Sequence, residues 1–242
     1  MFPNVVFHLE VVEECASTQQ LLIERRDSAD FHGTAILAIR QTAGVGRRGR
    51  EWSSREGNLA LSFGLELKEE TLLPLILFAS GLALYRTVKP HLPREADLCL
   101  KWPNDLYLDG KKLAGMIAQG RFLPGRGSDV VVGVGLNLAW HPEGLDPPAT
   151  SLVSYGVSLA PVMVASVFLQ NLSQSFQGFD NFNELKKEWE TCAHLGEHDL
   201  FVMGEAEPVF PLGLLPSGEL LVRTQNKEER RLSSEEVSLR FR

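Results

Sequence analysis

The stretch AGVGRRGREW, residues 43–52, decides between two fold classes. Its glycine spacing, G-x-G-x-x-G, matches the fingerprint of a turn that joins a strand to a helix in doubly wound parallel folds. The preceding GTAILAIRQ (33–41) is typical of a buried strand, but the following REWSSREGN (50–58) has no 3.6-residue period of apolar side chains. Glu66, about where the fingerprint expects an acidic residue, falls inside an alternating segment. We therefore predict a loop between two strands and regard the glycine match as accidental.

The segments around this loop predict an α/β fold with a mixed or antiparallel sheet and flanking helices. NLALSFGLEL (58–67) alternates strictly, so its leucines and Phe63 share one face of a half-buried strand. Further strands are predicted over NVVFHLEVV (4–12), ADLCLKW (96–102) and DVVVGVGLNL (129–138), with a hairpin at Asp109-Gly110. Helices are predicted after the capping-box signature at Ser17, from Thr71 to about Lys89, and over 160–177 and 182–193.

The sequence changes in character after Gly196. Short β segments separated by turn signals such as Pro216-Ser217-Gly218 predict a small β-barrel or sandwich. We therefore predict two domains, residues 1–194 and residues 195–242.

Composition limits the classes of partner. The chain of 242 residues carries a net charge of −7, yet Arg47, Arg48, Arg50 and Arg55 lie within nine residues. A local positive site on an acidic protein favours a small phosphate ligand over DNA. Three widely spaced cysteines indicate no disulfide framework, no secretory signal is visible, and the most apolar run (72–85) is too short to span a membrane. We expect a cytoplasmic protein that does not bind a membrane.

The arginines of the opening stretch suggest an anion site. Glycines let backbone amides approach an anion, and guanidinium groups match phosphate and carboxylate geometry. Crowded arginines repel one another, which predicts a loop that becomes ordered when an anion neutralises it. A solvated basic loop without a ligand is an equally good interpretation of this stretch alone.

Two other segments carry candidate site residues. In KWPNDLYLDGKKLAG (101–115), Asn104 and Asp105 are expected at the end of a strand, and Lys112, just after the hairpin turn, can point back toward them. An ordinary cross-strand ion pair would explain Asp105 and Lys112 equally simply. The two glycines of GVGLN (133–137) indicate either close approach of a ligand or tight packing. Cys192, His194 and His198 lie close in sequence, but Gly196 indicates a helix end, so we predict no metal bound by protein ligands alone.

Taken in order, STQ (17–19), QTAGVGRRGREW (41–52), KWPNDLYLDGKKLAG and GVGLN resemble the biotin protein ligases. PLGLLPSGELLV (211–222) and EEVSLR (235–240) are similar to the small SH3-like C-terminal domain of that family. The resemblance implies a class II synthetase-like catalytic domain and an enzyme that uses Mg²⁺ and ATP to convert biotin to biotinyl-5′-AMP. It also implies transfer of biotin to a lysine of a biotin carboxyl carrier protein.

The resemblance also implies roles for individual residues. Lys112, Arg47, Arg48 and Asp105 would be catalytic, with Lys112 touching the biotin carboxylate and Asp105 acting as a base or positioner. The remaining site residues would bind biotin or biotinyl-AMP; they are Ser17, Thr18, Gln19, Gln41, Gly44, Val45, Gly46, Arg50, Trp52, Asn104, Gly115, Gly135 and Asn137.

The chain departs from the family pattern in the arginine stretch. The family commonly has arginine where this chain has Val45, and lysine where it has Glu51. Because STQ arrives by residue 17, we expect no DNA-binding domain and no repressor activity. Two alternatives remain: a lipoate-protein ligase-like adenylating enzyme, and a non-catalytic module that binds biotin or a nucleotide. Edge strands of such a sheet could also pair two copies into a homodimer.

Overall fold

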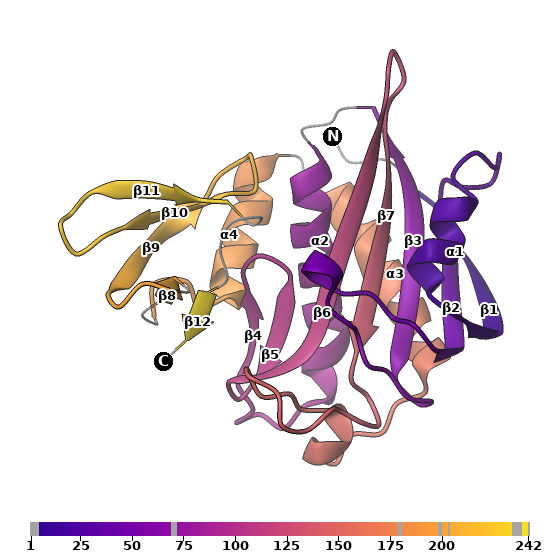
Figure 1. The fold of residues 1–242 in the computed structure, drawn as a ribbon, viewed down its shortest axis with the longest axis horizontal. Helices are drawn as coiled ribbons and strands as arrows, with labels where there is room; N and C mark the ends of the chain where they lie inside the picture. The colour runs from indigo at the N-terminus through magenta and orange to yellow at the C-terminus, as the bar shows by residue number, and fades with distance from the viewer. Residues whose placement is uncertain are drawn as a thin grey trace.

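A computed structural model describes six stretches of the chain, which contain two β-sheets and four α-helices (Figure 1). The described residues are 5–68, 72–178, 181–197, 200–202, 204–233 and 239–241. The predicted cap Thr71, the candidate ligand His198 and most of EEVSLR lie outside them.

The larger sheet has seven strands in the order β1-β2-β3-β7-β6-β5-β4. The strands are β1 (His8–Cys15), β2 (Thr34–Gln41), β3 (Leu59–Leu67), β4 (Leu98–Lys101), β5 (Asp105–Leu108), β6 (Lys111–Leu123) and β7 (Gly127–Leu136). β1 and β2 are parallel, and every other neighbouring pair in this sheet is antiparallel. The predicted mixed sheet is confirmed.

The helices cover the two faces of this sheet unequally. They are α1 (Thr18–Glu24), α2 (Leu73–Val88), α3 (Pro161–Gly178) and α4 (Phe182–Cys192). The alternating leucines of β3 and Phe63 pack with α2 and α3 in the main core, as their period of two predicts. On the opposite face, α1 packs near Ile36 and Val131, no other described α-helix lies there, and the loop between β2 and β3 crosses in front of β6 (Figure 1).

Local sequence signals correctly predict the start of α1 and the turn between β5 and β6. The Ser17 hydroxyl accepts from the Gln20 amide and caps α1, and Asp109 and Gly110 both have positive φ in the β5–β6 turn. The first strand begins at His8, which pairs with Thr34 at the start of β2; residues 5–7 are outside the strand, and residue 4 lies outside the described residues. The expectation that Asn104 and Asp105 end a strand is wrong: β4 ends at Lys101, the chain reverses in three residues, and Asp105 begins β5.

The smaller sheet follows α4 and has the order β11-β10-β9-β8-β12, with all its pairings antiparallel. Its strands are β8 (Leu200–Val202), β9 (Pro208–Leu214), β10 (Leu220–Arg223), β11 (Glu229–Leu232) and β12 (Leu239–Phe241). It confirms the small C-terminal β unit and is consistent with an SH3-like domain. Buried side chains of both sheets form one continuous apolar cluster. None of the described helices combines the length and apolar character needed to cross a bilayer.

Candidate active site

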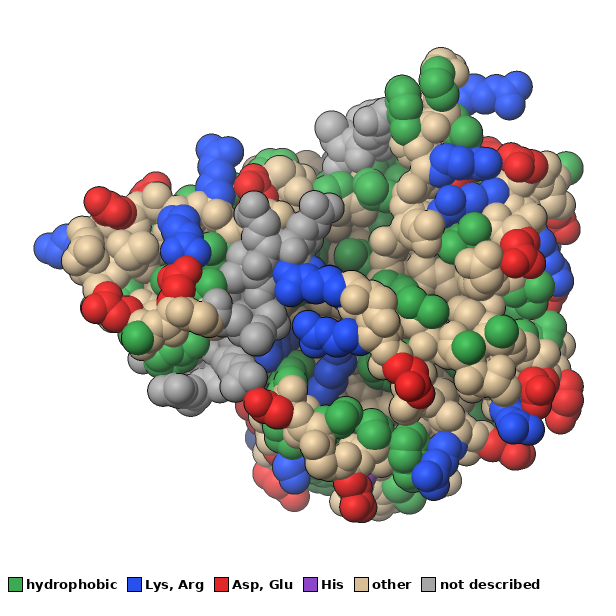
Figure 2. Space-filling view, viewed as in Figure 1, with side chains coloured by type: hydrophobic (Ala, Val, Ile, Leu, Met, Phe, Trp, Pro, Cys, Tyr) green, Lys and Arg blue, Asp and Glu red, His purple; other side chains and the backbone are tan. Residues whose placement is uncertain are grey.

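A cavity of about 620 Å³ opens on the face of the larger sheet that α1 packs against. Its walls come from the start of α1, the loop between β2 and β3, the β4–β5 hairpin, and the loop that follows β7. Figure 2 shows Lys and Arg side chains gathered beside the hollow in the middle of this face. The lining includes five cationic side chains (Arg47, Arg48, Arg50, Lys101, Lys112) and three carboxylates (Glu51, Asp105, Asp146). The cavity is thus positive within an acidic chain, which suits an anionic ligand.

The floor of the cavity is one row of residues across five strands. Strand register places Ala60, Gly135, Gly115, Asp105 and Lys101 side by side. The two glycines make the middle of this row flat. The Trp52 indole occupies the space that side chains at these two positions would fill. A Cβ on Gly135 would come within 2.2 Å of the ring, and one on Gly115 within 3.2 Å. The loop tryptophan can therefore rest directly on the sheet.

Polar side chains gather at the α1 end of the cavity. Gln41 Oε1 accepts from the Thr18 amide at 3.0 Å and from its hydroxyl at 3.3 Å. The same hydroxyl lies 2.8 Å from Ser62 Oγ on β3. These bonds fix the first turn of α1 against the sheet.

Two buried carbonyl oxygens of the lining have no hydrogen-bond partner among the described residues. They are Gln19 Oε1 and Asn137 Oδ1. The Gln19 side chain lies over Gly133 of β7, and a Cβ on Gly133 would be 2.6 Å from Gln19 Oε1. The Asn137 side chain is held by a hydrogen bond from its Nδ2 to the Thr150 carbonyl. A buried acceptor without a donor is costly, so these atoms are suited to a ligand that carries N–H or O–H groups.

Lys112 and Asp105 form an ion pair at the other end. Lys112 Nζ lies 2.7 Å from Asp105 Oδ1, and both side chains are partly buried. The backbone of Lys112 bonds to the loop after β7, donating to the Pro148 carbonyl at 2.8 Å and accepting from the Thr150 amide at 2.9 Å. The ammonium also lies 5.7 Å from the Trp52 ring centre. The predicted proximity of Lys112 to Asp105 is thus observed, and the backbone of Lys112 is held by the loop that follows β7.

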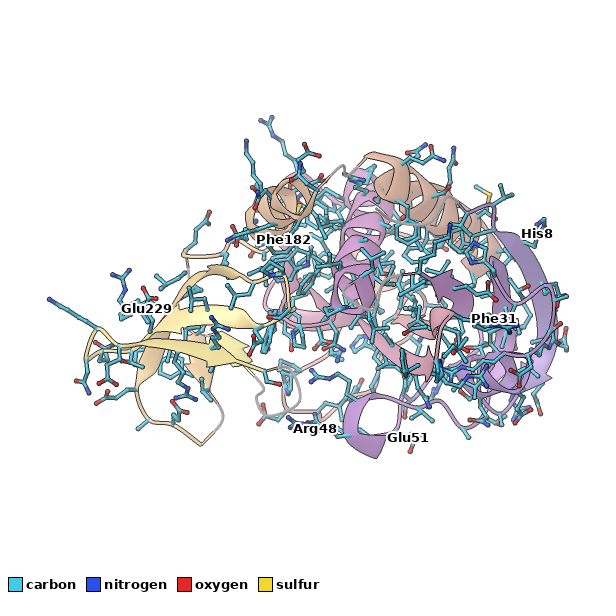
Figure 3. All side chains as sticks on the ribbon, turned by 90° about the horizontal axis from the view of Figure 1, so that it is seen from above. His8, Phe31, Arg48, Glu51, Phe182 and Glu229 are labelled. Carbon is cyan, nitrogen blue, oxygen red and sulfur yellow. The ribbon has the colours of Figure 1, made fainter. Side chains whose placement is uncertain are left out.

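The loop of residues 43–52, called the arginine loop below, closes on itself without an α-helix. The Gly46 amide donates to the Arg50 carbonyl at 2.7 Å and the Trp52 amide to the Gly44 carbonyl at 2.9 Å. Between them runs a single 3₁₀ turn, Arg47–Gly49. Figure 3 shows Arg48 and Glu51 on this loop, on the side of the sheet away from α4 and its Phe182. The absence of a helix after Gly49 agrees with rejecting the dinucleotide fingerprint.

Asn104 connects the arginine loop to the sheet. Its Oδ1 accepts from Arg47 at 3.1 Å. Its Nδ2 donates to the Met116 carbonyl, and its own carbonyl accepts from the Met116 amide at 2.9 Å. The Asn104 side chain is therefore held by β6 and presents its remaining oxygen to the loop.

Every predicted site residue except Gly44 lines the cavity. Those that do are Ser17, Thr18, Gln19, Gln41, Val45, Gly46, Arg47, Arg48, Arg50, Trp52, Asn104, Asp105, Lys112, Gly115, Gly135 and Asn137. Gly44 is buried behind them, where a Cβ would come within 2.4 Å of the Trp52 carbonyl and 2.5 Å of Gln41 Nε2. Close approach of the chain therefore requires glycine at this position.

Sequence reasoning missed several lining residues. Lys101 is 6% exposed and donates to the Tyr107 hydroxyl at 3.1 Å, and both line the cavity. Lys101 is the first residue of KWPND and lies at the end of a predicted apolar strand, so its charge at that position could have identified it as a candidate. Ser62 and Asp146 had none: Ser62 is one polar residue in an apolar strand, and Asp146 lies in what reads only as a Pro- and Gly-rich loop.

The cysteines do not provide a reactive thiolate. Burial raises the pKa of the Cys99 thiol to about 12 and that of Cys192 to about 11, and burial with the nearby Glu14 raises the pKa of Cys15. A protonated thiol is a poor nucleophile and a poor metal ligand. Within the described ranges, no three His, Cys, Asp or Glu side chains are grouped to hold a metal.

Comparisons with known proteins agree on one family. Residues 11–137, just over half of the chain, match the model of the biotin/lipoate A/B protein ligase family. A biotin–[acetyl-CoA-carboxylase] ligase of Mycobacterium tuberculosis is 37% identical over 72% of this chain and 66% of its own length. The protein of the same name from Paracoccus denitrificans is 34% identical over 78% of this chain and 83% of its own.

A solved structure extends the likeness to the whole fold. A biotin protein ligase from Aquifex aeolicus, in complex with biotin and ATP, superposes with a TM-score of 0.79 at 29% identity, covering 97% of this chain and 99% of that one. The chain therefore belongs to the biotin/lipoate A/B protein ligase family and, within it, to the biotin protein ligases.

Proposed function

We propose that this protein joins biotin to a lysine of a biotin carboxyl carrier protein, through biotinyl-5′-AMP made from biotin and Mg²⁺-ATP. The observation that carries the proposal is the cavity itself, in which Lys112 and the arginine loop surround a space of about 620 Å³. Five cations at one site can offset the repulsion between a carboxylate and a triphosphate. Relatives named biotin–[acetyl-CoA-carboxylase] ligases support the choice of substrate.

In the first step, a carboxylate oxygen of biotin attacks the α-phosphorus of ATP. The bond from the α-phosphorus to the bridging oxygen breaks, pyrophosphate leaves, and a mixed anhydride remains. Lys112 is proposed to hold the carboxylate and then the acyl-phosphate, with Arg47 and Arg48 at the phosphate. Such groups stabilise the charge that develops in phosphoryl transfer.

Magnesium fits this cavity as a companion of ATP. Carboxylate oxygens are its preferred protein ligands, and Asp146 in the lining would offer them. When bound, Mg²⁺ neutralises phosphate charge and favours the departure of pyrophosphate.

In the second step, the amine of the carrier lysine attacks the anhydride carbonyl. An amide bond forms, the bond to the phosphate oxygen breaks, and AMP leaves. The amine must lose a proton, and Asp105 is proposed to accept or position it. The ion pair with Lys112 at 2.7 Å holds the Asp105 carboxylate in place for this role.

The polar end of the cavity is proposed to bind the biotin ring. Ser17, Thr18, Gln19 and Gln41 offer hydroxyl and amide groups there, and the unpartnered Gln19 Oε1 can accept a ureido N–H. Asn137, Gly115 and Gly135 would border the bound intermediate. The remaining loop residues, Gly44, Val45, Gly46, Arg50 and Trp52, are proposed to close over it together with Asn104.

Four further expectations belong to this proposal. ATP use and three free cysteines support a cytoplasmic setting. The edge strand β1 leaves room for a homodimer, which sedimentation would detect. The division into residues 1–194 and 195–242 stays a prediction, as does the absence of DNA binding.

Pyrophosphate exchange into ATP, measured with the purified chain, tests the proposal. We expect exchange that depends on biotin, and transfer of biotin to a carrier domain. Exchange that depends on lipoate instead would support the lipoate-ligase alternative. Binding of biotin without any exchange would support the non-catalytic alternative.

A further inference from the structure

The β4–β5 loop, Trp102–Asn104, separates two residues of the cavity floor. Lys101 and Asp105 are register partners on either side of it. β4 is four residues long and is the last strand of the larger sheet. The positions of Lys101 and Asp105 in the cavity therefore depend on how this short loop is held.

One side of the loop is tied to the larger sheet. Asn104 makes two bonds with the backbone of Met116 on β6. These bonds fix the end of the loop that leads into Asp105. They do not hold the end that leads out of Lys101.

The other side of the loop is tied to the smaller sheet. Trp102 is 4% exposed, and its indole N–H donates to the Gly218 carbonyl at 3.1 Å, across 116 residues of sequence. Gly218 ends a tight turn between β9 and β10, in which its amide donates to the Leu215 carbonyl at 2.9 Å. The turn is itself confined, because a Cβ on Gly218 would lie 2.5 Å from Pro74 of α2 and its φ is 85°.

We propose that the Leu215–Gly218 turn positions the β4–β5 loop through Trp102. Trp102 is then a positioning residue for the nucleotide step of the proposed function, on which this inference rests. A buried indole N–H that loses its acceptor must move to find another, and Lys101 is its direct neighbour. The smaller sheet thus acts on the active site without contributing a side chain to its lining.

Trp102→Phe tests the proposal, because it keeps an aromatic ring and removes the donor. We expect the KM for ATP in biotin-dependent pyrophosphate exchange to rise about tenfold, the effect of losing one buried hydrogen bond. The KM for biotin should stay within twofold, since Thr18 and Gln41 lie at the far end of the cavity. Gly218→Ala should reproduce the effect, and combining the two changes should add little.

Trp189→Phe is the matched control. Trp189 is 2% exposed and packs on Phe78 in the main core, away from the cavity lining. It should lose stability without a change in the KM for ATP. An equal rise in that KM in Trp189→Phe, or none in Trp102→Phe, would overturn the proposal.

Hydrogen–deuterium exchange separates this inference from the proposed function. Trp102→Phe should speed exchange of the amides of residues 101–106 and 215–218 and leave β3 and β7 unchanged. Faster amide exchange in these two segments supports the positioning role of Trp102. Absence of pyrophosphate exchange by the wild-type chain would refute the proposed function and leave the positioning role intact. Unchanged amide exchange in both segments would refute the positioning role.

Discussion

The cavity has two walls of different construction. The sheet wall consists of Lys101, Asn104, Asp105 and Lys112, which sit on or between β4, β5 and β6 and are at most partly exposed. The arginine loop forms the other wall with one 3₁₀ turn, and Arg48, Arg50 and Val45 are exposed on it. Bonds to the backbone of Met116 on β6 and to the loop at Pro148 and Thr150 hold the sheet wall, whereas the arginine loop is closed mainly by bonds between its own residues.

This difference suggests a division of labour. Groups that must meet the reacting atoms are preorganised on the sheet, where burial and backbone bonds limit their motion. Under the proposed function, the groups that enclose the ligand lie on the arginine loop, and loops of this kind open for ligand entry and exit in many enzymes. Variants of the two walls should therefore affect different steps.

Lys112→Ala should give the largest effect, because it removes the fixed charge of the sheet wall. We expect biotin-dependent pyrophosphate exchange to fall by about 10²–10³-fold. Lys111→Ala is the matched control, since Lys111 is its exposed neighbour. Similar rates in both variants would remove Lys112 from the mechanism.

Asp105→Asn should mainly slow the second step. Transfer from preformed biotinyl-AMP to a carrier domain should fall by about 10²-fold, because an amide cannot accept the proton. Asp109→Asn, in the exposed turn of the same hairpin, serves as the comparison. Normal transfer by Asp105→Asn would exclude it as a base.

Gly135→Ala should break the contact between the floor and Trp52 of the arginine loop. Its Cβ would overlap the Trp52 indole, and overpacking of this kind costs about 1–3 kcal/mol in the free energy of unfolding. Urea unfolding should show that loss, and the double variant Gly135→Ala/Trp52→Ala should recover most of it relative to Trp52→Ala. Gly120→Ala, whose nearest neighbours would be the methyl groups of Leu73 at 3.1 Å, should cost less. An equal cost at both glycines would argue that Trp52 does not rest on the floor.

Val45→Arg should give the smallest effect, on the loop wall alone. Val45 is 52% exposed at the cavity rim, so an added cation there is screened by solvent. We expect release of biotinyl-AMP to slow about two- to fivefold, consistent with the modest energy of exposed ion pairs. The slower release should return to the wild-type rate at high salt, and Val45→Gln should not show it. A slowing that persists in high salt would indicate packing rather than charge.

Sequence alone predicts the parts of this site that depend on local signals. Ser17 caps α1 because its hydroxyl and Gln20 have the right spacing, and Asp109-Gly110 returns Lys112 to Asp105 because that dipeptide favours a tight hairpin. The arginine loop is recognised as a loop because no apolar period follows Gly49. In each case the deciding residues lie within a few positions of one another.

The rest depends on strand pairing and could not be predicted locally. Gly115 and Gly135 become neighbours only when β6 and β7 pair in one register, and Trp52 then lies on both. The bond from Trp102 to Gly218 joins residues 116 positions apart. Gly44 does not line the cavity, and the close approach of Gln41 and Trp52 that requires glycine there forms only in the folded chain.

The row of floor residues ties the chemistry of the cavity to sheet alignment. Successive side chains of a strand point to opposite faces, so a slip of one position would turn Leu59 or Leu61, Val134 or Leu136, and Ala114 or Met116 toward the ligand. The cavity would then fill with hydrocarbon while every residue of the site was still present in the chain. The burial of these six side chains in the main core is therefore what keeps the floor empty.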